Sequence, residues 1–245
     1  MSATAPAISM EGVVRSFGKT PVLTGVRLDV PAGSTTVLLG ANGAGKTTLL
    51  RVCAGLLESK AGTVRVLGLD PAKDRRALSE RIAFVPDRPD AWGFMTSRDL
   101  ARFLAAHHPR WNQVLCDSLY AELRVPADRP LSKMSRGEAV KAMFAASLGH
   151  EPEVLLLDEP FGGLDPLVHD EVLAGMVGAL DAGKRTVLVA THDLDVAARI
   201  GDRVAVLADG KIVRDLPMDV AVGDERTRAR REALKNVLHA AARGE

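Results

Sequence analysis

The sequence predicts an α/β fold with a parallel central sheet, an N-terminal antiparallel β meander and an inserted α-helical subdomain. Short apolar runs rich in Val, Ile and Leu alternate with helical stretches, which is typical of parallel strands covered on both faces. Residues 8–36 instead alternate apolar and polar positions between turn residues, which favours the meander. Residues from about 95 to 150 contain no good strand and carry apolar residues at helical spacing, which predicts the insert.

Four apolar runs are the expected strands of the central sheet. They are STTVLLG (34–40), RIAFVPD (81–87), EVLLLDE (153–159) and RTVLVATH (185–192). The first stops in glycines and is followed by KTTLLRVCAGLL, which has helical spacing, so this segment predicts strand, loop and helix. LVHDEVLAGMVGALDAG (167–183) predicts a further helix.

The insert and the C-terminal tail are expected to be helical. SRDLARFLAAHH (97–108) and WNQVLCDSLYAELRV (111–125) place apolar residues three and four positions apart. In the tail, Leu234, Val237, Leu238 and Ala241 share one face and arginines the other, so we expect a helix that packs on its own domain. These expectations make the chain one domain, with an α/β core (about 1–87 and 151–220), a helical subdomain (about 88–150) and a helical tail (221–245).

The composition excludes several classes of protein. The chain has 245 residues, 47% of them apolar, and 32 basic against 31 acidic side chains, a balance that provides no general attraction to nucleic acid. Cys53 and Cys116 form no CxxC pair and are expected to be buried thiols in a reducing cytosol. We see no signal peptide and no run near the roughly 20 apolar residues of a membrane span. If the protein serves a membrane, we expect it to do so from the cytoplasm, through another chain.

The stretch GANGAGKTT (40–48) fits the phosphate-loop pattern G-x-x-x-x-G-K-[ST] and lies between an expected strand and an expected helix. Its glycines let backbone N–H groups turn toward one point, and the following helix adds its positive N-terminal end. Lys46 would place a charge on the terminal phosphates, and Thr47 would offer its hydroxyl to Mg²⁺. The candidate phosphate-binding residues are Gly40, Asn42, Gly43, Ala44, Gly45, Lys46, Thr47 and Thr48.

Two adjacent acids, Asp158 and Glu159, end the apolar run LLLDE. Alone, such a pair would suit helix capping at the end of a strand. With Lys46 present, Asp158 is expected to hold Mg²⁺ directly or through water. Glu159 would then orient or deprotonate the attacking water, a role worth on the order of 10²–10⁴-fold in rate.

Further motifs follow in an order that resembles the ATP-binding cassette (ABC) ATPases over nearly the whole chain. Ser135 and Gly137 in KMSRGEAVK correspond to the serine-glycine signature of that family, Asp165 in GGLD to its D-loop, and His192 in ATHD to its switch histidine. Phe17 in VVRSFGKT corresponds to the aromatic residue that stacks on adenine. Alone, Ser135 would be read as a helix N-cap, and Phe17 and His192 as core residues.

The resemblance implies a P-loop NTPase core that binds ATP and Mg²⁺ and hydrolyses ATP. Ser135 and Gly137 of one copy would close over ATP held by a second copy, in a head-to-tail dimer that Asp165 crosses. His192 would contact the γ-phosphate and help polarise the water. Both sites of a homodimer would be complete. The family usually couples this clamp to integral membrane permease subunits, which implies a location on the inner face of the cell membrane.

The chain departs from the family pattern at three positions. Asp87 in FVPD replaces a glutamine and can still ligate the metal, and Arg136 and Glu138 replace a glycine and a glutamine of the signature. Arg136 could face the membrane subunit or the phosphates of the partner. Together with FVPD and the HPRW run (108–111), these departures resemble the subfamily paired with type-2, export-class permeases.

Two questions stay open at this point. Trp92, Phe94 and Met95 in DRPDAWGFM could receive a helix of the permease or could cap the core of the insert. The leading expectation for function is the ATPase subunit of an exporter, and the alternative is a soluble ABC ATPase of the iron–sulfur assembly or cell-division type. A translation or DNA-repair ATPase is disfavoured, because the chain has neither a second cassette nor a long coiled-coil insert.

Overall fold

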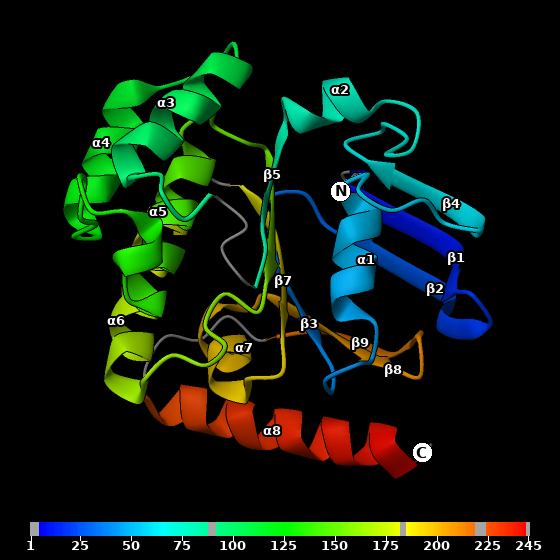
Figure 1. Ribbon diagram of the computed structural model, residues 1–245. Coiled ribbons are helices and arrows are strands. Elements are labelled where there is room, and N and C mark those ends of the chain that lie inside the picture. The colour runs from blue at the N-terminus through cyan, green and yellow to red at the C-terminus, as the bar shows by residue number, and fades with distance from the viewer. Residues whose placement is uncertain (1–4, 88–91, 182–184, 219–223, 244–245) are drawn as a thin grey trace. The chain divides into compact units, whose positions relative to one another are not determined.

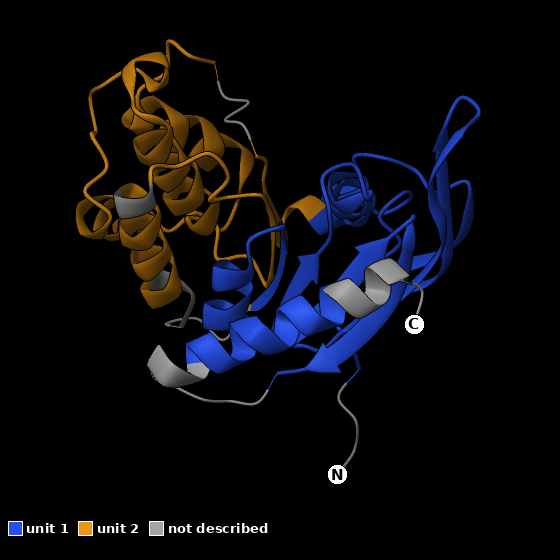
Figure 2. Ribbon diagram, turned by 90° about the horizontal axis from the view of Figure 1, so that it is seen from below, with its two compact units in different colours: residues 1–78, 186–245 blue, residues 79–185 orange. Residues whose placement is uncertain are grey.

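The computed structural model describes residues 5–87, 92–181, 185–218 and 224–243. The chain divides into two compact units (Figure 2). Unit 1 comprises residues 1–78 and 186–245, and unit 2 comprises residues 79–185. The division of the sequence at about residues 87 and 150 stays a prediction.

Unit 1 contains a three-stranded antiparallel sheet in the order β2-β1-β4. Strands β1 (Ile8–Phe17) and β2 (Thr20–Val30) form a hairpin, and β4 (Ala61–Val66) pairs with the other edge of β1. The hairpin confirms the antiparallel N-terminal strands. Strand β4 was not expected, because only Val64 and Val66 of its side chains are buried and its apolar signal is short.

The second sheet of unit 1 is built around β3 (Thr35–Leu39). This strand is parallel to β7 (Thr186–Thr191) on one side and to β8 (Arg203–Ala208) on the other, while β9 (Lys211–Pro217) is antiparallel to β8. Residues 36–39 are fully buried, which explains the unbroken apolar run. The parallel strands predicted near residues 34–40 and 185–192 are therefore confirmed.

The helices of unit 1 are α1 (Lys46–Cys53), the short α2 (Arg75–Ser79) at the boundary with unit 2, α7 (Leu194–Ile200) and α8 (Asp224–Arg243). Helix α8 lies beside α7 (Figure 1). Its Leu234 is 5% exposed and joins the apolar cluster of β3, β8 and α7, and Leu238 packs against the same cluster. The expectation that the tail packs on its own domain is confirmed for these residues.

Unit 2 pairs β5 (Ile82–Val85) in parallel with β6 (Val154–Asp158). Its helices are α3 (Ser97–His107), α4 (Gln113–Glu122), the 3₁₀ turn η1 (Leu131–Lys133), α5 (Arg136–Leu148) and α6 (Pro166–Asp181). Between residues 95 and 150 there is no strand beyond one isolated bridge, which confirms the helical insert.

Local signals explain where the helices of unit 2 begin. Thr96 and Asp99 form a reciprocal capping box at α3, and the side chain of Asn112 caps α4.

Trp111 of the HPRW run packs over Gly149, where an added Cβ would lie 2.4 Å from the indole ring. The HPRW run therefore has a packing role at the C-terminal end of α5.

Two further expectations concern cysteines and membrane spans. Cys53 and Cys116 are free and buried, as expected, and burial raises the pKa of the Cys116 thiol to about 11. Among the helices that the structure describes, none is both long enough and apolar enough to span a bilayer.

Candidate functional site

The glycine-rich loop joins β3 to α1 inside unit 1. Gly45 is the N-cap of α1 and has φ 106°, a left-handed conformation that side-chain-bearing residues rarely adopt. A Cβ on Gly40 would lie 2.5 Å from the carbonyl oxygen of Leu207, so the loop approaches the end of β8 too closely for any other residue. The sequence pattern thus folds into the strand–loop–helix geometry that exposes backbone N–H groups at a helix N-terminus.

Lys46 places its charge under this loop. The residue is 5% exposed, and its Nζ donates hydrogen bonds to the carbonyl oxygens of Gly40 at 2.7 Å and of Ala41 at 3.1 Å. Helix α1 has no acidic residue in its first turn. The helix end and the buried ammonium therefore combine into a positive environment suited to an anion such as a phosphate.

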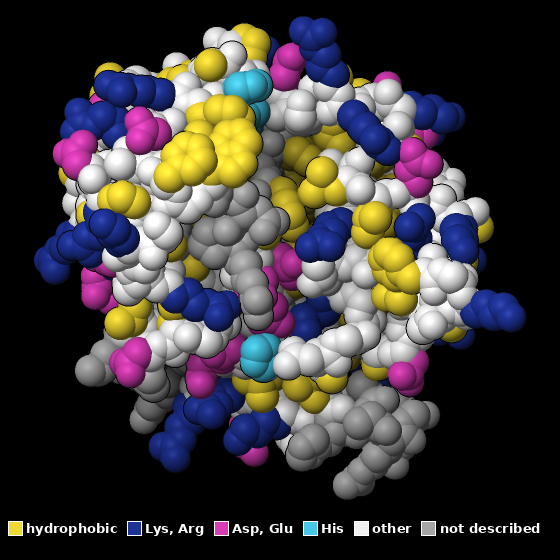
Figure 3. Space-filling model, viewed as in Figure 1, with side chains coloured by type: hydrophobic (Ala, Val, Ile, Leu, Met, Phe, Trp, Pro, Cys, Tyr) yellow, Lys and Arg dark blue, Asp and Glu magenta, His cyan; other side chains and the backbone are white. Residues whose placement is uncertain are grey.

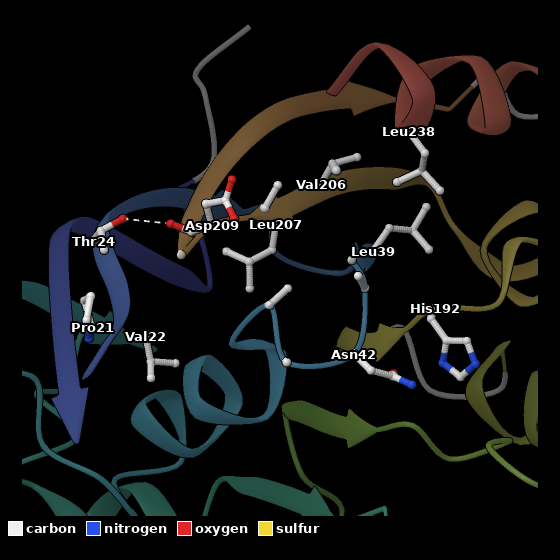
Figure 4. A pocket seen from close by; sticks show the side chains of 16 residues that line it. Pro21, Val22, Thr24, Leu39, Asn42, His192, Val206, Leu207, Asp209 and Leu238 are labelled. Atoms are coloured by element: carbon white, nitrogen blue, oxygen red, sulfur yellow. Dashed lines mark hydrogen bonds between the residues drawn. The ribbon is translucent and has the colours of Figure 1, made fainter. Parts of the chain in front are cut away.

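His192 lies at the same edge of the sheet as the loop. Leu39, the last residue of β3, pairs with Thr191, the last residue of β7, so His192 and Gly40 follow neighbouring strand ends. Both residues line one pocket, and Figure 4 shows Asn42 and His192 on the same side of it. Strand β2, the β8–β9 turn and Leu238 of α8 complete the wall.

Phe17 is not one of the residues that line this pocket. It ends β1, is 48% exposed and packs under the Arg15 guanidinium, whose carbon lies 5.0 Å from the ring centroid. Among the described residues that line the pocket, β2 contributes Pro21, Val22 and Thr24, and Phe17 is not included.

The paired acids lie in unit 2 at the end of β6. Asp158 is the last strand residue and is 2% exposed. Glu159 has φ 45°, a left-handed conformation that turns the chain sharply, and its carbonyl oxygen accepts a hydrogen bond from the N–H of Gly162 at 3.0 Å. The turn directs the chain away from the strand and into the loop that precedes α6. Asp165 lies exposed just before that helix.

Ser135 and Gly137 begin α5, and each has a structural role. Ser135 is the N-cap: its Oγ accepts from the N–H of Glu138 at 3.2 Å, and its own N–H donates to the Glu138 carboxylate at 2.8 Å. This backbone hydrogen bond, with Arg129 beside it, lowers the pKa of Glu138. A Cβ on Gly137 would lie 2.6 Å from Val168, so glycine allows α5 and α6 to pack closely.

Asp87 meets Arg136 within unit 2. The guanidinium Nη2 of Arg136 donates to Oδ1 of Asp87 at 2.7 Å. The structure therefore brings the candidate residues together in two groups. The loop and His192 share a pocket in unit 1, and Asp87 lies beside the signature stretch in unit 2.

The sequence did not indicate that the β8–β9 turn and β2 line the pocket. The dipeptide Asp209–Gly210 is a hairpin signal that predicts the turn. Its position beside the loop depends on Gly210, where a Cβ would lie 2.4 Å from the carbonyl oxygen of Val22. Because Gly210 and Val22 are far apart in the chain, no local sequence pattern predicts that they lie close together.

Comparison with known proteins identifies the family. The protein-family model described as "ABC transporter" matches residues 23–162. The aliphatic sulfonates import ATP-binding protein SsuB of Corynebacterium glutamicum is 36% identical over 228 residues, covering 91% of this chain and 88% of that protein. The sulfate/thiosulfate import ATP-binding protein CysA of Shigella flexneri is 34% identical over 224 residues, covering 87% of this chain but only 61% of that protein.

The fold of this chain resembles that of a solved ABC transporter subunit. A structure described as "Structure of ATP binding subunit of ABC transporter" superposes with a TM-score of 0.78 at 26% identity, covering 87% of this chain and 90% of that chain. The chain thus spans about three-fifths of the length of the CysA relatives and nearly the whole of the superposed subunit.

Proposed function

Because the chain belongs to the ABC transporter family, we propose that it binds and hydrolyses ATP to drive solute transport through a separate permease. The observation that carries this proposal is the phosphate loop: Gly45 in a left-handed conformation, Lys46 buried beneath the loop, and His192 in the same pocket. An isolated glycine-rich turn would need neither the buried ammonium nor the histidine.

The residues of the loop would hold the polyphosphate. The backbone N–H groups of residues 42–48 and the Lys46 ammonium would bind its oxygens. Thr47 and Asp158 would hold a magnesium ion, which neutralises charge on the phosphate oxygens when bound. The donors suit this ion, because Mg²⁺ uses one or two protein oxygens together with phosphates and waters.

Glu159 and His192 would act on the attacking water. The Glu159 carboxylate would accept its proton, and His192 would donate a hydrogen bond to the γ-phosphate. The sequence makes Asp87 a candidate third oxygen ligand of the metal, although its carboxylate is paired with Arg136 in the structure.

We infer a second copy of the chain as the partner in the clamp. Ser135 is exposed at the N-terminus of the thirteen-residue helix α5, where a partner's γ-phosphate would meet a positive helix end. Asp165 is exposed as well and would lie at the dimer interface. Since ADP lacks the γ-phosphate, only ATP would favour the closed dimer.

An exposed aromatic patch of unit 2 is the proposed docking site for the permease. The patch consists of Trp92, Phe94, Phe103 and His107. Trp92 is 57% and Phe94 76% exposed, with their rings stacked at 6.2 Å, and Phe103 meets Trp92 edge-on at 5.5 Å. Figure 3 shows hydrophobic side chains gathered beside a histidine on this face. The exposure of these aromatic side chains supports docking over the alternative that they cap the insert. Met95, which follows Phe94, is half-buried. Residues 88–91 of the same stretch lie outside the described residues.

The relatives bear on the direction of transport. The family resemblance of FVPD and HPRW favoured export, whereas SsuB and CysA are named as import proteins, so export is not confirmed and the relatives favour import. Their names make sulfate and aliphatic sulfonates the first solutes to test. The soluble alternative, an iron–sulfur assembly or cell-division ATPase, gains no support from these relatives.

One experiment tests both the partner and the direction. The tagged chain is purified from gently solubilised membranes, and the proteins bound to it are identified. A co-purifying protein with several membrane spans is expected, and it should then move solute into or out of sealed vesicles when ATP is supplied. Trp92→Ala should weaken co-purification, whereas Val114→Ala, at an 81% exposed position on α4, should not. Recovery of no membrane protein would contradict the transport role.

A further inference from the structure

The Arg136 guanidinium contacts two segments of unit 2 that are far from it in sequence. Its Nη2 donates to Oδ1 of Asp87 at 2.7 Å and reaches the Asp87 carbonyl oxygen at 3.5 Å. A Cβ added to Gly163 would lie only 2.8 Å from Nη1 of Arg136, so the guanidinium packs against the backbone of that glycine. One side chain therefore joins the segment after β5, the start of α5 and the loop after β6.

Each of these three segments carries residues assigned above to the nucleotide. Asp87 was expected to be a metal ligand, Ser135 immediately precedes Arg136, and Gly163 lies between Glu159 and Asp165. The capping box of Ser135 and Glu138 fixes the backbone at Arg136. A bridging side chain on a fixed backbone can hold the other two segments in register with the helix start.

We propose that Arg136 is a positioning residue for ATP hydrolysis and that Asp87 is its partner rather than a magnesium ligand. The proposal rests on the proposed function. The Asp87 carboxylate would have to give up a charge-assisted hydrogen bond before it could bind a metal. While it is paired, its negative charge is offset and does not repel a polyphosphate.

A contribution to folding stability does not explain the pair of Arg136 and Asp87. The side chains of Arg136 and Asp87 are 39% and 41% exposed, and ion pairs at such exposure contribute little to folding. Loss of the pair should therefore shift the Tm by no more than about 4 °C. The pair Arg81–Glu153 offers a matched control, because it lies in the same unit at 2.6 Å with exposures of 36% and 49%.

A charge swap tests the proposal. Asp87→Arg and Arg136→Asp should each lower kcat between about 10- and 100-fold by displacing the segments that they position. The double variant should recover to within about threefold of the parent chain, because the pair is restored in reverse and an acid at the start of α5 suits the helix end. A magnesium ligand could not be rescued in this way. If the double variant stays as impaired as Asp87→Arg and needs more Mg²⁺ for half-maximal rate, the proposal is overturned.

A measurement without nucleotide separates this inference from the proposed function. Amide hydrogen exchange at residues 136–139 and 162–165 should be faster in either single variant, normal in the double variant and normal in Arg81→Gln. Should a swapped single variant fail to fold, Asp87→Asn and Arg136→Gln replace it with the same expectation. Unchanged exchange in the single variants, or the same change in Arg81→Gln, would overturn the inference even if the parent chain hydrolyses ATP. If the parent chain shows no hydrolysis, the proposed function fails, and the exchange data still decide whether Arg136 holds the segments.

Discussion

The Lys46 ammonium donates a 2.7 Å hydrogen bond to the carbonyl oxygen of Gly40, at the opposite end of the same loop. The contact holds a buried charge beneath the loop. A lysine held by its own loop has less side-chain freedom to lose when it binds a phosphate.

Replacing Lys46 with methionine should weaken ATP binding by about 10- to 100-fold. The variant keeps the apolar stem and loses charge-assisted hydrogen bonds worth roughly 1.5–3 kcal/mol. Titration with a fluorescent ATP analogue measures the affinity, and circular dichroism checks that the fold is retained. Lys60→Met, at an exposed lysine of the same unit, serves as the control and should bind like the parent chain. Equal affinity for the Lys46 and Lys60 variants would contradict the role of the loop.

Replacing Glu159 with glutamine should lower ATP turnover by about 10²–10⁴-fold, because the amide cannot accept the proton of water. Binding should persist, so Mg²⁺ and ATP together should produce a stable dimer on size-exclusion chromatography. Glu151→Gln, at an exposed glutamate before β6, should hydrolyse ATP normally. An ATP-loaded Glu159→Gln chain that remains monomeric would argue against the clamp.

Alanine at Gly45 should be more destabilising than alanine at Gly43. Both glycines have positive φ, 106° and 83°, which costs an alanine about 1–2 kcal/mol. Only at Gly45 would the new Cβ also meet the carbonyl oxygen of Val22, at 3.0 Å, whereas Gly43 has no atom within 4 Å. Thermal unfolding without nucleotide should show the larger fall in Tm for Gly45→Ala. The reverse order would mean that the loop relaxes away from β2.

Acid should destabilise the chain through His150. This residue is 5% exposed, its Nε2 donates to the carbonyl oxygen of Ile82 at 3.0 Å, and its ring stacks on His108 at 4.0 Å. Burial, assisted by His108 and Arg185, lowers its pKa to about 4 although the Ile82 hydrogen bond opposes the shift. The unfolded chain, with a histidine pKa near 6.5, therefore binds the proton first as the pH falls.

The contribution of the neutral, buried His150 to the free energy of unfolding is fully present above about pH 6.5. It falls by roughly 1–3 kcal/mol as the pH drops toward 4. Urea unfolding at several pH values measures the loss. His150→Gln keeps a donor for Ile82 but does not titrate, so its unfolding free energy should depend less on pH across this window. Parallel pH profiles for the two proteins would remove His150 from the explanation.

The sequence predicted the parts of the fold that rest on local pattern. The runs that became β3, β6 and β7 are apolar on both faces, and glycines and caps marked where α1 and α5 begin. Strand β9 was not predicted, because it is an edge strand with mostly half-buried side chains and a charged sequence, KIVRDLP.

The candidate site residues were assigned from motifs and from the family resemblance. The loop was predicted from its own motif and His192 from the family resemblance of ATHD, and the structure adds that both follow neighbouring strand ends and line one pocket. The ion pair between Asp87 and Arg136 could not be predicted, because 49 residues separate the two and neither FVPD nor KMSRGEAVK indicates the other as its partner. The sequence allows Arg136 to face a membrane subunit or the phosphates of a partner, whereas in the structure its guanidinium contacts Asp87 of its own chain.

Strand β3 has a consequence for how the protein is made. Both of its hydrogen-bonded neighbours, β7 and β8, come after residue 185. At translation rates of about 5–20 residues per second, roughly 7–30 seconds pass between the synthesis of β3 and that of its partners. During that interval an apolar strand with open edges waits on the ribosome, so chaperone binding to the nascent chain should concentrate between residues 35 and 39.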